Sequence, residues 1–176
     1  MQGESPAPSG PDEEPICAFR IPPFLELVPK YASRLLACLD TSQHGVRAHL
    51  AISEALSNAI LYGALGLRPD CAEREPSALL QAVRAAREAR GRNEVFARVS
   101  RWDELTVVVI KDPGQGFDWT AASAEPEGGP TDPLALHGRG FFLMRLACKR
   151  VTWNEAGNEV SLWFTDGRPR GPGVQP

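Results

Sequence analysis

The most informative segment is Ala51-Ile-Ser-Glu-Ala-Leu-Ser-Asn-Ala-Ile60, because it places a carboxylate and an amide on a helix that is mostly apolar. Apolar residues cover most of the circumference of the predicted helix 45–62, as expected for a largely buried helix. Glu54 and Asn58 are four residues apart and share one narrow sector, where an unpaired carboxylate would be costly to bury. Either this sector faces solvent, with Arg47 partly neutralising Glu54, or it lines a site. In a site, Glu54 would act as a base and Asn58 would offer its oxygen to a hard cation.

A second polar motif, Asp112-Pro-Gly-Gln-Gly-Phe117, follows the apolar run of residues 107–110. The run predicts a strand that is covered on both faces. Gly114 and Gly116 permit a close backbone approach or a positive φ. An acidic acceptor at the end of a strand can select an exposed amino group, although strand-Asp-Pro-Gly is also an ordinary turn.

A third motif, His137-Gly138-Arg139-Gly140, directly precedes a short amphipathic helix predicted over residues 140–150. Glycines at a helix start expose backbone N–H groups at the positive end of the helix dipole, which suits an anion. A flexible connection to a helix has the same pattern. Arg139 either reaches a phosphate or faces water.

The other segments predict the remainder of one domain over residues 16–165. Periodicity and turn residues predict further helices over 24–39, with Pro29 in the first turn or at a kink, and from Pro76 to Gly91. Strands are predicted over 16–22, 93–101 and 104–112, and in a closing hairpin over 150–165. Helices followed by hairpins indicate an α+β two-layer sandwich, with helices on one face of a mixed, mostly antiparallel sheet.

Composition limits the class of protein. With 43% hydrophobic and 23% charged residues, the chain is typical of a soluble globular domain. A net charge of −3 gives no general attraction to nucleic acid or to an anionic membrane. The Gly/Pro-rich segments 1–15 and 166–176 predict disordered tails, and the first lacks the features of a secretory signal. The four cysteines lack metal-ligand spacing, so we expect free thiols and a cytoplasmic location.

Taken together, the three motifs resemble the N-box, G1 box and G2 box of the GHKL ATP-binding superfamily, whose fold is the Bergerat (histidine-kinase-like ATPase) fold. Residues 51–60, 112–117 and Gly138-Arg-Gly-Phe-Phe-Leu-Met144 are most similar to bacterial anti-sigma-factor serine kinases. The resemblance covers about 16–165. It implies an ATP lid over 118–137. The 53 residues between Asn58 and Asp112 exceed what the compact kinases of this branch would have. We therefore expect a family-specific insertion over 66–93, whose arginines line either a solvated helix face or a partner surface.

The resemblance also implies a role for each site residue. Glu54 would be the general base, and Asn58 would ligate a Mg²⁺ ion that the ATP phosphates mainly hold. Asp112 would accept a hydrogen bond from the adenine amino group. The other implied nucleotide contacts are Gly114 and Gly116 beside the base, Gly138, Arg139 and Gly140 at the phosphates, and the Ser161 hydroxyl near the adenine.

The implied activity is that of a Mg-ATP-dependent serine/threonine protein kinase that acts as an anti-sigma factor. Such a protein sequesters a sigma factor, phosphorylates a STAS-domain antagonist and commonly forms a homodimer. No direct contact with nucleic acid or membrane is expected. Three alternatives stay open: a non-catalytic ATP/ADP-binding regulatory module, an interaction module without nucleotide, and an ATPase that acts on water.

Overall fold

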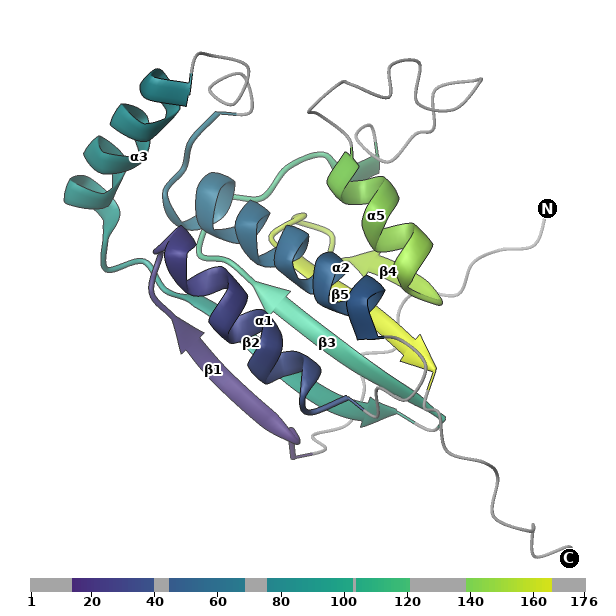
Figure 1. Ribbon diagram of the computed structural model, residues 1–176. Coiled ribbons are helices and arrows are strands. Elements are labelled where there is room, and N and C mark those ends of the chain that lie inside the picture. The colour runs from purple at the N-terminus through teal and green to yellow at the C-terminus, as the bar shows by residue number, and fades with distance from the viewer. Residues whose placement is uncertain (1–13, 40–44, 69–75, 103, 121–138, 166–176) are drawn as a thin grey trace, which may run out of the picture.

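Five antiparallel strands form one open sheet in a computed structural model, which describes residues 14–39, 45–68, 76–102, 104–120 and 139–165 (Figure 1). The strand order is β1-β2-β3-β5-β4. The strands are β1 (Cys17–Ile21), β2 (Val95–Trp102), β3 (Leu105–Lys111), β4 (Arg150–Trp153) and β5 (Glu159–Thr165). All four pairings are antiparallel, so the sheet is not mixed within the described residues.

Helices cover one face of this sheet. The helical segments are η1 (Leu25–Leu27), α1 (Val28–Leu36), α2 (Gly45–Asn58), η3 (Ala59–Ala64), α3 (Pro76–Arg90) and α5 (Arg139–Ala147). In Figure 1, α1, α2 and α5 lie over the same face of the strands, whereas α3 stands at the side. The expected two layers of an α+β protein are therefore confirmed.

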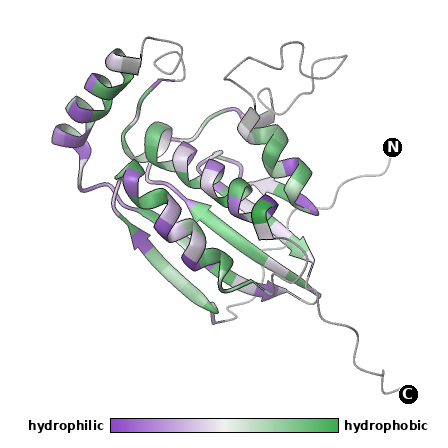
Figure 2. Cartoon of the chain, viewed as in Figure 1, coloured by the Kyte–Doolittle hydropathy of each residue, from purple (hydrophilic) through white to green (hydrophobic). Residues whose placement is uncertain are grey.

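Strand register divides the sheet residues between two faces. Val108, Ile110 and Leu162 point to the helices and join α2 residues in the main core. Val107 and Val109 point the other way and form a smaller cluster with Trp163. Because successive strand residues alternate between faces, the apolar run of β3 supplies both clusters, as its sequence predicts. Figure 2 shows β3 as hydrophobic along its length, whereas α3 alternates between hydrophobic and hydrophilic residues.

The predicted helix over 45–62 changes its winding near its end. After Asn58 the chain continues as the π-helical η3, in which the backbone N–H of Leu65 donates to the carbonyl of Ile60 at 2.9 Å. Other predicted elements are confirmed: Pro29 lies in the first turn of α1, and α3 begins at Pro76 and ends before Gly91.

Several predictions concern residues outside the described ranges. The two tails lie there almost entirely, as do Gly138 and all of the predicted lid beyond Thr120. Cys17, Cys38 and Cys148 are free thiols. None of the helices in the described part of the chain combines the length and apolarity that crossing a bilayer requires.

Candidate functional site

The second half of α2 places Glu54 and Asn58 against the start of α5. The apolar face of α2 packs on the sheet, which turns these two half-buried side chains to one flank of the helix. A Cβ atom built on Gly140 would lie 3.1 Å from Oε2 of Glu54 and 3.4 Å from Nδ2 of Asn58. A carboxylate and an amide therefore meet the glycine at which α5 begins.

Both side chains are available to a ligand. Among the described residues, neither Glu54 nor Asn58 has a hydrogen-bond or ion-pair partner. Arg47 is exposed and forms no ion pair with Glu54. The alternative in which Arg47 partly neutralises Glu54 is therefore not supported. Two half-buried polar side chains that lie together and leave their polar atoms without a partner in the described part of the protein mark a candidate binding site.

Asp112 directly follows β3 and lies against the π-helical turn. A Cβ atom on Gly63 would overlap the carboxyl group of Asp112. Oδ1 of Asp112 accepts a hydrogen bond from the backbone N–H of Gly114 at 2.8 Å, as in an Asx turn. Oδ2 has no hydrogen bond to a described residue. Burial raises the pKa of Asp112, and the Gly114 N–H offsets part of that rise.

Gly114 completes this contact. A Cβ atom at position 114 would lie 2.7 Å from Oδ1 of Asp112 and 2.9 Å from Cα of Gly63. Glycine is therefore required at both 63 and 114 for the end of β3 to reach η3. The result is a carboxylate with one free oxygen, held about one helical turn beyond Asn58.

The hairpin between β4 and β5 contacts the turn that follows β3. The side-chain amide of Asn158 donates to the carbonyls of Gly114 at 3.2 Å and Asp112 at 3.4 Å. The backbone N–H of Asp112 in turn donates to the carbonyl of Asn158 at 2.9 Å. Gly116 has a φ of +79°, and a Cβ atom there would overlap the carbonyl oxygen of Ala156. Contact with the hairpin therefore explains Gly116.

Two residues of this arrangement were not expected from the sequence. Gly63 interrupts an apolar helical run, and that isolated glycine was the available signal for a close approach. Asn158 had no comparable signal, because its partners are carbonyls 44 and 46 residues earlier in the chain. Only the pairing of β3 with β5 brings them together.

Ser161 does not join the group. Its register partner is Val109, which belongs to the cluster on the face away from the helices. Glu54, Asn58 and Asp112 lie on the helix side, so the Ser161 hydroxyl is on the opposite face of the sheet. The reason is strand alternation, which the sequence could not phase without the register. Gly138 is outside the described residues, and Arg139 begins α5.

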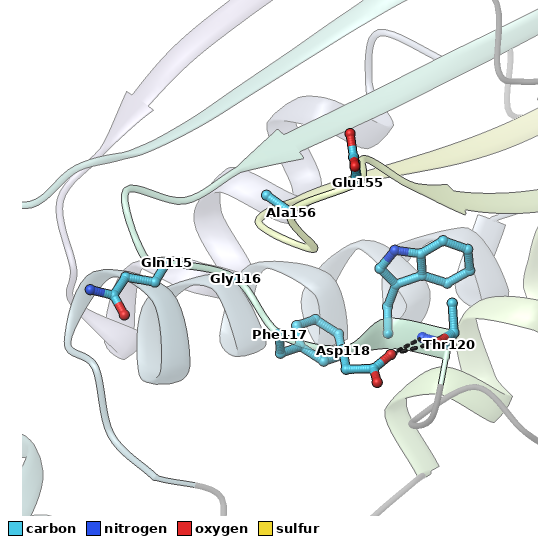
Figure 3. Close-up of a pocket in the computed structure, with 8 residues that line it drawn as sticks. Gln115, Gly116, Phe117, Asp118, Thr120, Glu155 and Ala156 are labelled. Carbon is cyan, nitrogen blue, oxygen red and sulfur yellow. Dashed lines mark hydrogen bonds between the residues drawn. The ribbon is translucent and has the colours of Figure 1, made fainter.

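A hollow of about 520 Å³ lies between the segment that follows Gly114 and the β4–β5 hairpin. It is lined by residues 115–120 together with Glu155 and Ala156 (Figure 3). There Oδ1 of Asp118 accepts from the backbone N–H and the hydroxyl of Thr120, at 3.1 and 2.5 Å. Neither Glu54 nor Asn58 lines the hollow, so volume alone does not identify the candidate site.

A row of packed aromatic rings connects the residues that line the hollow with α5. Phe117 packs edge-on against Phe141 at a centroid distance of 5.9 Å, and Phe141 stacks on Trp153 at 5.2 Å. Trp153 also stacks on Trp119 at 5.7 Å. Because Phe141 follows Gly140 directly, this row of rings fixes the start of α5 relative to the turn that carries Asp112.

The polar groups present suit a ligand that brings its own metal. No cluster of three His, Cys, Asp or Glu side chains occurs in the described ranges. Asn58 offers a single neutral oxygen, which fits a Mg²⁺ ion held mainly by phosphate oxygens. Comparison with known proteins found no protein-family model and no curated protein that matches the chain.

Proposed function

We propose that this protein is a Bergerat-fold, Mg-ATP-dependent serine/threonine kinase. We further propose that it works in the cytoplasm as an anti-sigma factor and phosphorylates a STAS-domain antagonist. One observation carries the proposal. Half-buried Glu54 and Asn58 lie against Gly140, while Asp112 lies against Gly63 on the next turn of the same helical segment. The motif resemblance described above adds the reaction, the sigma factor, the antagonist and a homodimer.

The chain's own residues supply the chemistry as follows. Glu54 takes the proton from the acceptor hydroxyl while the hydroxyl oxygen bonds to the γ-phosphorus, and ADP leaves with the bridging oxygen. The free Oδ2 of Asp112 accepts a hydrogen bond from the exocyclic amine of adenine. Gly140 leaves room for phosphate oxygens beside α5.

Magnesium fits this assignment through Asn58. When bound, Mg²⁺ would neutralise charge on the transferred phosphoryl group. The amide oxygen of Asn58 is the protein ligand that would hold it, together with the ATP phosphates. Asn58 would therefore bind and position the Mg-ATP, whereas Glu54 alone would move a proton.

The test is transfer of label from γ-³²P-ATP to the purified STAS-domain protein of the same host. Glu54→Gln is expected to lower the transfer rate by about 10²–10⁴-fold, while binding of a fluorescent ADP analogue is retained. Glu88→Gln, on the exposed face of α3, is the matched control and should transfer normally. Undiminished transfer by Glu54→Gln would remove Glu54 from its role. Nucleotide binding without any transfer would leave the non-catalytic ATP/ADP module as the function.

A further inference from the structure

Two side chains join the end of α3 to the end of η3. The side-chain amide of Asn93, two residues before β2, donates to the carbonyl of Ala64 at 3.1 Å. A Cβ atom on Gly66 would overlap Nη1 of Arg90, so the guanidinium group lies directly against the backbone of Gly66. The backbone N–H of Asn93 donates to the carbonyl of Arg90 at 3.0 Å, which keeps the two residues in one turn. Both side chains therefore contact the chain just where η3 ends.

These contacts suit the end of a helical segment. The last carbonyl groups of a helix have no partner within the helix, and Asn93 supplies a donor for the carbonyl of Ala64. A cation is favourable at the same end, because the helix dipole is negative there. Arg90 places its charge at that end, although much of its side chain is open to solvent. The two residues therefore cap the continuous helical segment that α2 and η3 form.

α3 can hold η3 because α3 is itself fixed to the protein. Arg87 forms an ion pair with Glu26 at 3.4 Å and lies over the ring of Phe24 at 4.1 Å. Apolar side chains of α3 lie in the main core or pack against it, namely Leu79, Val83 and Ala86. α3 is therefore a fixed support, although it stands at the side of the helical layer (Figure 1).

The turn that Asn93 caps is the turn that meets Asp112. Ala64 directly follows Gly63, and a Cβ atom on Gly63 would overlap the carboxyl group of Asp112. Contacts this close leave no gap that could absorb a displacement. A shift of η3 therefore changes the position of the Asp112 carboxyl group.

We propose that Arg90 and Asn93 are positioning residues that set the selectivity of the nucleotide site for adenine. They act through η3, which holds Asp112 opposite the exocyclic amine of the base. Glu54 and Asn58 lie against the start of α5 instead, so the phosphate end of the site does not depend on α3. This inference rests on the nucleotide site of the proposed function and is independent of phosphoryl transfer.

A purely structural role for these two residues would have a different effect on binding. Loss of a contact that only stabilises the fold lowers the fraction of binding-competent protein, which weakens the binding of every nucleotide by the same factor. Loss of a contact that positions Asp112 weakens the binding of adenine nucleotides alone. The ratio of the affinities for Mg-ADP and for Mg-bound inosine diphosphate (Mg-IDP), which lacks the amine, separates the two roles.

The test measures both dissociation constants by calorimetry with the full chain. Asn93→Ala removes the donor to Ala64, and Asn93→Asp keeps the size of the side chain but cannot donate. Arg90→Gln removes the charge beside Gly66. Arg84→Gln, at an exposed position of the same helix, is the matched control.

We expect the Asn93 variants and Arg90→Gln each to weaken Mg-ADP binding by about fivefold, the equivalent of one hydrogen bond. Mg-IDP binding should stay within about twofold of the wild-type value, and Arg84→Gln should leave both constants within the same range. Faster hydrogen exchange at residues 60–67 in the Asn93 and Arg90 variants would support the same role. Equal weakening of both nucleotides overturns the proposal, as does an unchanged affinity for Mg-ADP.

The same measurements separate this proposal from the kinase proposal. Selective Mg-ADP binding that the variants lose, in a protein that transfers no phosphoryl group, would contradict the kinase function and support the positioning role. Selectivity that all variants keep, in a protein that does transfer phosphate, would do the reverse. A wild-type protein that binds neither nucleotide would refute the nucleotide site and the positioning role together.

Discussion

At the scale of single residues, Gly63 and Asp112 lie so close together that no Cβ atom fits at position 63. A Cβ atom at position 63 would overlap the carboxyl group of Asp112, including its Cβ. Alanine normally stabilises a helical position by up to about 1 kcal/mol relative to glycine. Overpacking a buried contact costs about 1–3 kcal/mol. We therefore expect Gly63→Ala to lower the free energy of unfolding, measured in urea, by about 1–2 kcal/mol. This is the opposite of what the higher helix propensity of alanine alone would give.

Gly45→Ala is the matched control for this prediction. A Cβ atom at Gly45 would have nothing within 4 Å, so the substitution should be neutral or stabilising by up to about 1 kcal/mol. If Gly63→Ala also proves neutral or stabilising, Asp112 can move away from η3 without cost. The close approach would then be no constraint on the site.

The half-buried carboxyl of Asp112 predicts that stability and nucleotide binding depend on pH in opposite directions. Because burial raises its pKa in the folded state, the folded protein holds this proton more tightly than the unfolded chain. The associated stability is present below the unfolded pKa and is lost as pH rises through the folded pKa. At pH 7.5 the folded protein therefore bears the cost of a partly buried charge.

We expect Asp112→Asn to raise the Tm at pH 7.5, because the amide is neutral and keeps an oxygen for the Gly114 N–H. The gain in Tm should shrink at pH 4, where the wild-type carboxyl gains its proton. Binding of the ADP analogue should be lost in the same variant. A Tm difference that is equal at both pH values would contradict the assignment of the effect to this carboxyl.

Residue types alone identified most of the candidate site. Glu54, Asn58, Asp112 and Gly114 stand out because polar or glycine residues are unusual on a buried helix and at the end of a buried strand. Ser161 shows the limit of such reasoning. A hydroxyl on a strand belongs to one face or the other, and a shift of one residue reverses the choice. The register with Val109 places it away from the site.

At the scale of elements, the turn after β3 depends on a hairpin more than 40 residues later. Asn158→Ala removes the donor to the carbonyls of Asp112 and Gly114, and the acceptor for the side-chain amide of Asn154 at 2.7 Å. Each such bond contributes about 1 kcal/mol. We expect a loss of about 1–3 kcal/mol and faster hydrogen exchange at residues 112–117.

Asn158→Asp separates the two roles of this side chain, because a carboxylate keeps the acceptor but cannot donate to the carbonyls. We expect it to speed exchange at 112–117 about as much as Asn158→Ala does. If exchange there stays at the wild-type rate in both variants, the hairpin amide does not hold the turn.

The elements themselves were largely predictable, since periodicity, Pro29 at a helix start and Gly91 at a helix end are local signals. The π-helical winding of η3 was not. It occurs where Gly63 meets Asp112, a contact between segments about fifty residues apart in sequence. Local propensity has no information about such contacts, and π-helical turns often occur at functional sites.

At the scale of the whole molecule, the candidate contacts come from three separate parts of the chain: the end of α2 with η3, the turn after β3, and the start of α5. The sheet and the core beneath the helices hold these parts in place. A ligand that touches all three is bound by the folded state and not by the unfolded chain. Its binding free energy therefore adds to the stability of the entire domain.

This coupling gives the last prediction. At about 100 times its Kd, Mg-ADP should stabilise the fold by about 2.7 kcal/mol, which corresponds to a rise in Tm of about 5–11 °C for a chain of this size. Inosine diphosphate is the matched control, because it presents a carbonyl oxygen in place of the adenine amine. Facing the Asp112 carboxylate, that oxygen finds no donor, so Mg-IDP should give a much smaller rise. Equal shifts from the two nucleotides would exclude Asp112 from base recognition, and no shift from either would refute the nucleotide site itself.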